Sequence, residues 1–185
     1  LSHEKALHTL INLGIDEAQK GNLEVAITYF AQAANAHPNA PEAVNNLGQA
    51  LHRSGDFSQA EACLRKALQD FPNNNEIKLS LGTLLLQLGN FAEGFPLFEA
   101  RFLANETLKN SRPNFPCSEW RGENLNNKAL LIYAEQGFGD SLQFVRYLAV
   151  LRKTYPKAQL FFASRPALFS LFADFAAQNR VNLQT

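Results

Sequence analysis

The chain has 185 residues, of which 46% are hydrophobic, and it carries 17 basic and 17 acidic residues. This length and composition allow one domain or two small ones with a buried core, and the balanced charge offers no general attraction for nucleic acid or an anionic membrane. No apolar run approaches the roughly 18 residues that cross a bilayer, and the N-terminal residues lack the pattern of a signal peptide. We therefore expect a soluble, cytoplasmic protein without nucleic-acid partners and without membrane insertion.

The cysteines and the missing methionine say little about chemistry. Cys63 and Cys117 match no metal or redox spacing, and no group of His, Cys, Asp or Glu has the spacing of a metal site. The sequence contains no Met. We therefore expect a fragment, a processed product or a trimmed product of a longer chain.

The first half of the chain repeats a pattern every 34 residues. A Leu-Gly pair, a later glycine and two large apolar residues recur in the same order. The three copies are Leu13, Gly14, Gly21, Leu23 and Phe30; Leu47, Gly48, Gly55, Phe57 and Leu64; and Leu81, Gly82, Gly89, Phe91 and Phe98. Repeats of this length predict antiparallel helix pairs stacked as an α-helical solenoid, with units at 7–40, 41–74 and 75–108.

The third unit departs from the pattern of the other two. Gly94 stands where they have a small Ala, and Pro96 falls inside the second helix, which is therefore expected to kink or to start late. A solenoid of three units also needs a cover for its last helix. We expect the aromatic, proline-containing stretch that follows to supply it.

This pattern resembles that of tetratricopeptide repeat proteins, in which the first helices of the units line a concave groove. The resemblance implies a protein or peptide ligand, bound by polar residues that face the groove. The candidate groove residues are Asn12, Asn46 and Ser80, which form one column, together with Asn45, Gln49, His52, Arg53 and Thr83. The same reasoning expects His8, Ile11, Ile15, Leu79 and Leu86 to face the groove.

The column of Asn12, Asn46 and Ser80 carries a second resemblance. In the O-linked N-acetylglucosamine transferases an asparagine ladder at this repeat position holds a peptide backbone, and Asn12 and Asn46 match it here. Asn at this position also bonds neighbouring turns, and His52 and Arg53 also suit a solvated groove surface without a ligand. Both interpretations stay open at the level of sequence.

Residues 109–127 lack helical periodicity and contain two prolines, one glycine and the only Trp. Phe115 and Trp120 are costly to leave in water, so this stretch predicts a packed connector and not a free linker. We expect it to pack against the third repeat.

Residues 128–185 change to a strand and helix pattern. The apolar runs LLIYA, QLFFA and RVNLQT alternate with helices expected at 141–153 and in PALFSLFADFAAQ. This order predicts a partial, Rossmann-like α/β unit with a short parallel sheet. In a sheet ordered third-second-first, the outer edge of the first strand would lack a partner, so we expect a homodimer or another contact there.

The glycine-containing turn after the first strand could bind a ligand or only join strand to helix. It lacks the third glycine of a dinucleotide site and the Lys-Ser/Thr pair of a phosphate loop, and Asp140 would repel a phosphate. Spacing alone favours a turn that Gly137 and Gly139 permit, with Asp140 as the N-cap of the following helix.

The stretch from Lys128 through Phe172 also resembles the start of the glycosyltransferase-like domain that follows tetratricopeptide repeats in many bacterial proteins. It is similar to the first βαβ segment of the heptosyltransferases, which have a GT-B fold. The resemblance implies an acceptor loop that includes Gln136, Gly137 and Gly139, with Asp140 as the general base toward the acceptor hydroxyl. Tyr133 stands where similar repeat proteins often have His.

A GT-B enzyme binds its nucleotide sugar mainly in a second domain, for which this chain has no room. We therefore expect no cofactor and no catalysis in this portion, and a nucleotide sugar only in an intact, longer protein. Three hypotheses stay open: a peptide-binding repeat module fused to an incomplete glycosyltransferase-like domain, the acceptor-binding part of an active glycosyltransferase, and an adaptor whose α/β part is a structural cap.

Overall fold

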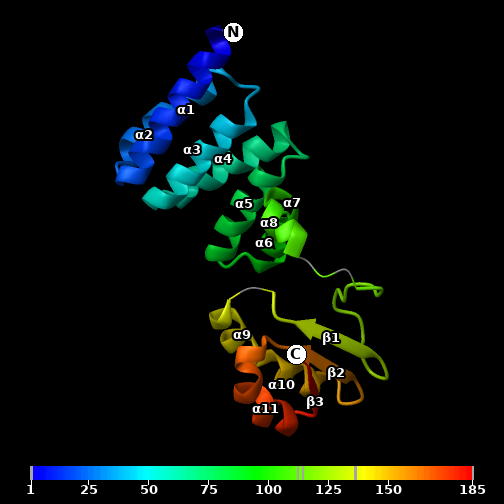
Figure 1. Cartoon of the computed structure of the whole chain (residues 1–185). Coiled ribbons are helices and arrows are strands. Elements are labelled where there is room, and N and C mark those ends of the chain that lie inside the picture. Colours follow the sequence, from blue (N-terminus) through cyan, green and yellow to red (C-terminus); the bar gives the residue numbers. More distant parts are fainter. Residues whose placement is uncertain (1, 112, 114, 136, 185) are drawn as a thin grey trace. The chain divides into compact units, whose positions relative to one another are not determined.

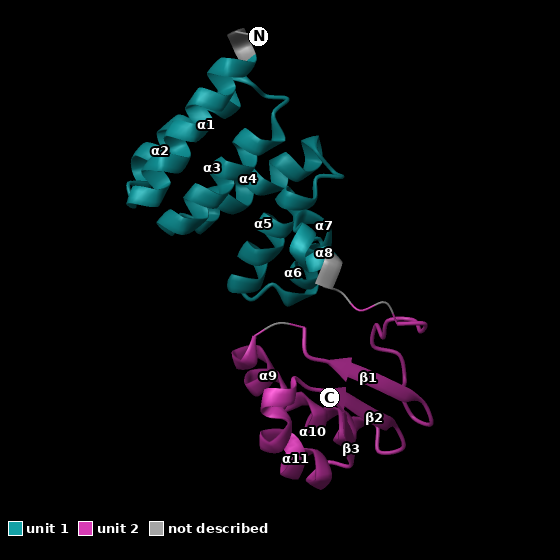
Figure 2. Ribbon diagram, viewed as in Figure 1, with its two compact units in different colours: residues 1–112 teal, residues 113–185 magenta. Residues whose placement is uncertain are grey.

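A computed structural model describes residues 2–111, 113, 115–135 and 137–184 (Figure 1). It divides the chain into two compact units, residues 1–112 and 113–185 (Figure 2). The stretch expected as a connector, 109–127, is therefore shared between them. Each unit is described by itself.

The first unit is a stack of helices that follow one another in chain order (Figure 1). Its helices are α1 (Ser2–Lys20), α2 (Leu23–Ala36), α3 (Pro41–Ser54), α4 (Phe57–Asp70), α5 (Asn75–Gln87), α6 (Phe91–Phe98), α7 (Arg101–Ala104) and α8 (Glu106–Ser111). The three predicted helix pairs are confirmed as α1 with α2, α3 with α4, and α5 with α6.

The repeated glycines have two different physical roles. Gly21, Gly55 and Gly89 adopt left-handed backbone with φ of 87°, 87° and 82°, which only glycine adopts without strain, and so they end the first helix of each pair. Gly48 instead lies against the partner helix. A Cβ on Gly48 would lie 2.5 Å from Cδ2 of Leu64, a side chain with no exposed surface, so glycine is needed for the helices to approach.

The third pair differs from the expectation in where its second helix ends. α6 begins at Phe91, directly after Asn90, whose Oδ1 accepts a hydrogen bond from the Glu93 amide at 3.4 Å. The expected late start is wrong. Pro96 lies inside α6, and the helix ends at Phe98 after 8 residues. The helix continues for two residues past Pro96, and the alternative expectation of a kink there stays a prediction.

Helix α7 lies against the last helix pair. α7 packs on α5, and Phe102 of α7 is buried with 6% of its surface exposed. The rings of Phe115 and Trp120 pack on Tyr133 and Tyr155 within the second unit, at centroid distances of 5.4 and 6.4 Å. The expected packing of these aromatics against the third repeat stays a prediction.

The second unit is a three-stranded parallel sheet in the order β1-β2-β3 with helices between the strands. Its elements are β1 (Ala129–Tyr133), α9 (Phe138–Phe144), α10 (Tyr147–Thr154), β2 (Gln159–Ala163), the 3-10 turn η1 (Pro166–Leu168), α11 (Phe169–Gln178) and β3 (Val181–Gln184). The predicted strand order and parallel pairing are confirmed. One long helix was expected at 141–153, and two shorter ones, α9 and α10, occupy that region.

The core of the second unit lies on one face of the sheet. Leu160 and Phe162 alternate along β2 and are 0% and 4% exposed, and they pack with Leu148 of α10 and Phe172 of α11. Arg152 of α10 closes one end of this layer. Its guanidinium and Nε donate to the carbonyls of residues 156, 158, 179 and 180 at 2.6 to 3.1 Å.

Candidate functional site

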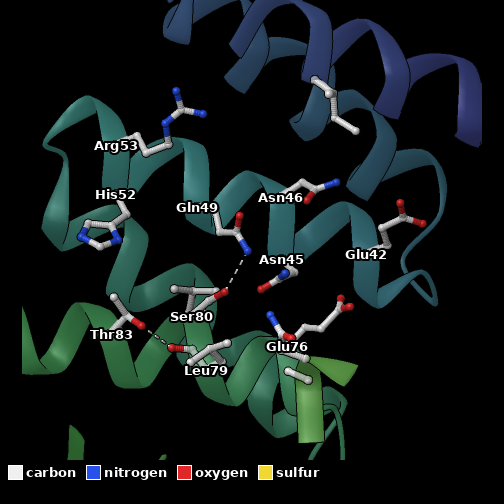
Figure 3. Close-up of a pocket in the computed structure, with 14 residues that line it drawn as sticks. Glu42, Asn45, Asn46, Gln49, His52, Arg53, Glu76, Leu79, Ser80 and Thr83 are labelled. Carbon is white, nitrogen blue, oxygen red and sulfur yellow. Dashed lines mark hydrogen bonds between the residues drawn. The ribbon is translucent and has the colours of Figure 1, made fainter. Parts of the chain in front are cut away.

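A cavity of about 760 Å³ opens on the first helices of the second and third helix pairs (Figure 3). Most of its lining comes from α3 and α5, and the rest comes from Ile15 of α1, Leu64 of α4, Ala104 of α7 and Asn105. Seven of the candidate groove residues line it: Asn45, Asn46, Gln49, His52, Arg53, Ser80 and Thr83. Repetition explains this grouping, because equivalent positions of stacked helix pairs face the same side.

Asn45 is the most buried polar side chain of this lining. It is 4% exposed, and its Oδ1 is buried without a hydrogen-bond partner in the part of the chain that the structure describes. The equivalent positions of the other two units hold the apolar residues Ile11 and Leu79. An amide stands here in a column that is otherwise apolar, although an unpaired buried acceptor destabilises a fold by about 1–3 kcal/mol.

One hydrogen bond of this wall joins α3 to α5, and another lies within α5. Nε2 of Gln49 donates to Oγ of Ser80 at 3.0 Å, so the buried Ser80 is held by a groove residue of the preceding unit. The hydroxyl of Thr83 donates to the carbonyl of Leu79 at 2.8 Å. The wall of the cavity is therefore fixed before any ligand arrives.

One end of the cavity carries basic side chains. Nη2 of Arg53 donates to the carbonyl of Ala18 in α1 at 3.2 Å, and Nε2 of His52 lies 2.6 Å from Oε1 of Gln87 in α5. His52 also packs edge-on against the Phe57 ring, with 5.9 Å between centroids. These contacts give both residues a structural role in joining successive helix pairs.

The opposite end of the cavity carries two carboxylates that sequence reasoning missed. Glu42 and Glu76 lie in the first turns of α3 and α5 and line the cavity. They occupy equivalent positions, 34 residues apart. The repeat offset was the signal that could have found them. Figure 3 shows them toward one end, with His52 and Arg53 toward the other, Gln49 and Ser80 between, and Asn45 on the side of the glutamates.

Several other residues expected in the groove lie elsewhere. Asn12 and His8 are exposed on α1 but are not among the described residues that line the cavity. Ile11 is 2% exposed and packs with Ala33 and Ala43, so its assignment to the groove is wrong. Leu86 is also misassigned, because it packs against α6, where a Cβ on Gly94 would lie 2.9 Å from its Cδ2.

The loop after β1 differs from its prediction in how it starts the helix. Gln136 lies outside the described residues. The N-cap of α9 is Gly137, and Asp140 lies in the first turn of the helix, so the expected Asp140 cap is wrong. Gly137 has φ of −49° and Gly139 is inside α9, and neither has positive φ. The turn therefore does not depend on left-handed glycine backbone.

Asp140 is nevertheless exposed after the carboxyl end of β1. Its Oδ2 would lie 3.8 Å from a Cβ on Gly137, which places the carboxylate beside the start of α9. A carboxylate in a first helical turn is stabilised by the helix dipole. The geometry thus gives Asp140 a structural reason to be present and leaves its surface open to a solute.

Metal-binding groups, membrane-spanning helices and thiols of the described residues also bear on function. No group of three or more His, Cys, Asp or Glu among them is arranged to hold a metal ion. None of the helices in the described ranges is long and apolar enough to cross a membrane. The two thiols, Cys63 and Cys117, are free, and burial raises the pKa of the Cys63 thiol.

The repeats match a known family. Residues 6–73 and residues 53–105 each match a family described as "Tetratricopeptide repeat". Together the two matches cover more than half of the chain. Residues 6–105 therefore belong to the tetratricopeptide repeat family.

Two curated relatives share part of this sequence. Protein FlbA of Caulobacter vibrioides is 28% identical over 133 residues, which cover 69% of this chain and 22% of FlbA. Photosystem I assembly protein Ycf3 of Rippkaea orientalis is 33% identical over 54 residues, 29% of this chain and 31% of Ycf3. The chain thus spans less than a third of either relative. The FlbA match is longer than the first unit, so it extends into the second.

Two solved structures share the fold. The tetratricopeptide repeat domain of Arabidopsis OM64 superposes with a TM-score of 0.51 at 18% identity and covers 57% of this chain and 87% of that domain. A mutant O-GlcNAc transferase of Thermobaculum terrenum superposes with a TM-score of 0.50 at 13% identity, over 100% of this chain and 42% of the transferase. At these identities the likeness concerns the fold alone.

Proposed function

We propose that this chain binds a segment of another polypeptide in the cavity on α3 and α5. The observation that carries the proposal is Asn45, an amide that is 4% exposed, has an unpaired Oδ1 and lines that cavity. A folded chain seldom leaves a buried acceptor unpaired, and a ligand that brings a donor compensates for it. Nothing in the packing of α3 requires an amide, because the flanking repeats have Ile11 and Leu79 there.

The form of the cavity suits an elongated ligand. It runs over two successive helix pairs, and its floor carries polar groups from both, including Gln49 and Ser80. A polypeptide offers donors and acceptors at regular intervals along its length, which suits such a row. One relative, Ycf3, is named an assembly protein, which is in keeping with a role in binding other proteins.

The test of this proposal uses two matched threonines. Thr83 lines the cavity and Thr28 of α2 does not, and both are exposed with a hydroxyl that donates to the carbonyl four residues earlier, at 2.8 and 3.0 Å. Peptides selected from a random display library on the intact chain are measured by fluorescence anisotropy. Thr83→Arg should weaken binding at least tenfold, and Thr28→Arg should leave it unchanged. Equal binding by both variants would refute the assignment of the groove.

A second candidate function is the acceptor-binding part of a glycosyltransferase in a longer protein. It is supported by the resemblance around Gly139 and Asp140 and by the exposure of Asp140 after β1. The fold likeness to the Thermobaculum transferase spans the whole chain. In such an enzyme Gln136, Gly137 and Gly139 would belong to the acceptor loop, Asp140 would take the proton of the acceptor hydroxyl, and a nucleotide sugar would be the donor.

The two candidates are separated by activity. The intact longer protein is incubated with nucleotide sugars and the selected peptides, and transfer is followed by mass spectrometry. Transfer that falls at least a hundredfold in Asp140→Asn supports the general-base role. Peptide binding without transfer under any donor supports an adaptor whose α/β unit is a structural cap. A cytoplasmic location stays a prediction in either case.

A further inference from the structure

We infer that the groove selects polypeptide segments with a lysine or arginine side chain and holds that cation at the end of the cavity where Glu42, Glu76 and Asn45 lie. The inference rests on the proposed binding of a polypeptide and names the chemistry of its ligand. It depends on three features of the described residues. They are the two carboxylates without an ion pair, the unpaired amide oxygen of Asn45 beside them, and the distance that separates Glu42 from Arg53.

The carboxylates and the amide share one side of the cavity. Glu42 and Asn45 are three residues apart in α3, and residues at this spacing are neighbours on one face of a helix. Glu76 enters from the equivalent position of α5. Figure 3 shows Glu42, Glu76 and Asn45 gathered toward the same end of the cavity.

Neither carboxylate has an ion pair within the described residues, although other glutamates of the same unit do. Glu17 pairs with Lys20 at 2.7 Å, and Glu93 pairs with Arg65 at 2.6 Å. The basic groove residue Arg53 is too far along α3 to neutralise Glu42, since eleven residues of helix span about 16 Å. Its guanidinium is also bonded to the carbonyl of Ala18.

The helix dipole explains a single glutamate in a first turn but not the whole arrangement. A carboxylate near a helix N-terminus is favourable by itself, and Glu4 and Glu24 occupy such positions outside the cavity. The dipole provides no reason for an unpaired amide beside two of these carboxylates. Asn45 is therefore the observation that points from a helix-stabilising feature to a ligand.

The groups at this end call for a cation that only donates. Carboxylates accept hydrogen bonds, and so does Oδ1 of Asn45, which has no partner among the described residues. A lysine ammonium has three donors and an arginine guanidinium has five, and neither has an acceptor. An acidic side chain would be repelled here, and a neutral one would leave both charges without a partner.

The experiment begins with the peptides selected on the intact chain. Their sequences should share a Lys or Arg at one position, and replacing it by Gln should weaken binding at least tenfold in fluorescence anisotropy. The double variant Glu42→Gln, Glu76→Gln should lose the same affinity and bind both peptides alike. The control double variant Glu4→Gln, Glu24→Gln changes first-turn carboxylates outside the cavity and should bind like the parent.

The outcomes separate this inference from the function on which it rests. Peptides without a shared basic residue, or peptides that bind the Glu42 and Glu76 variant at full strength, overturn the basic anchor. If Thr83→Arg still weakens the binding of those peptides, the groove remains the binding site. If the peptides bind the Thr83→Arg variant as tightly as the parent, the groove is not the binding site. A selection that yields no binder contradicts both the proposed peptide binding and the basic anchor.

Discussion

The unpaired amide of Asn45 leads to a prediction that concerns stability before any ligand is known. Asn45→Leu replaces the amide by an apolar group of similar shape at a position where the flanking units have Ile11 and Leu79. The amide oxygen has no partner in the described part of the chain, and such an acceptor costs about 1–3 kcal/mol. Some of that gain is lost to the added methyl volume. We expect a net stabilisation of about 1 kcal/mol.

The assay is urea unfolding of the intact chain followed by far-UV circular dichroism, with the free energy of unfolding extrapolated to water. Asn12→Leu is the matched control, because Asn12 is exposed on α1 and its replacement should change the free energy by less than about 0.5 kcal/mol. A loss of more than about 1 kcal/mol in Asn45→Leu would show that the amide is paired in the free protein. Asn45 would then give no reason to place a ligand in this cavity.

The same variant should also lose function. Asn45→Leu should bind the selected peptides at least tenfold more weakly while it unfolds at higher urea concentration than the parent. A gain in stability together with a loss of binding is typical of residues that are kept for a ligand. A stabilised variant with unchanged affinity would leave Asn45 without the role assigned to it.

Four further predictions concern the two units. Gly48→Ala should destabilise the first unit by about 1–3 kcal/mol in urea unfolding, because the added Cβ would lie 2.5 Å from Cδ2 of the buried Leu64. Gly139→Ala should have little effect, because no atom would lie within 4 Å of the added Cβ. Arg152→Met should destabilise the second unit by about 2–4 kcal/mol on the same assay, since it removes donors from four carbonyls. Hydrogen bonds from Arg65 lower the pKa of Glu93, so this pair stabilises the fold at neutral pH and is lost as the pH falls through the lowered pKa. Glu93→Gln should therefore reduce the loss of unfolding free energy that the parent shows as the pH falls. The difference should be less than about 1 kcal/mol, because the pair is so exposed. Analytical ultracentrifugation should detect a dimer if the outer edge of β1, which pairs only with β2 among the described strands, is an interface, and a monomer at high concentration would contradict it.

The repeats could be predicted from sequence because their determinants are local. A glycine at a helix end and a glycine where two helices meet act within one unit, and three copies make the pattern visible. Gly48 illustrates this, because it lies against Leu64 of the partner helix in the same unit. The strands of the second unit were predictable because short apolar runs, such as QLFFA, alternate with helical segments.

The remaining features depend on contacts between distant residues. The packing of Trp120 on Tyr155 could not be predicted from composition, which shows that a ring must be buried but not where. The start of α9 moved ahead of Asp140 because the Ser141 amide and hydroxyl both donate to the Gly137 carbonyl, at 3.4 and 3.3 Å. Glu42 and Glu76 were missed because a glutamate in a first helical turn has an ordinary explanation until a cavity places two together.

The most direct test of the binding site is an NMR titration of the intact, ¹⁵N-labelled chain with a selected peptide, observed at the side-chain amide of Asn45. We expect this resonance to shift and to saturate at the affinity measured by anisotropy. The form of the peptide with Gln in place of its Lys or Arg should produce the shift only at concentrations at least tenfold higher. A peptide that binds while the Asn45 amide resonance stays unchanged would contradict binding at this site.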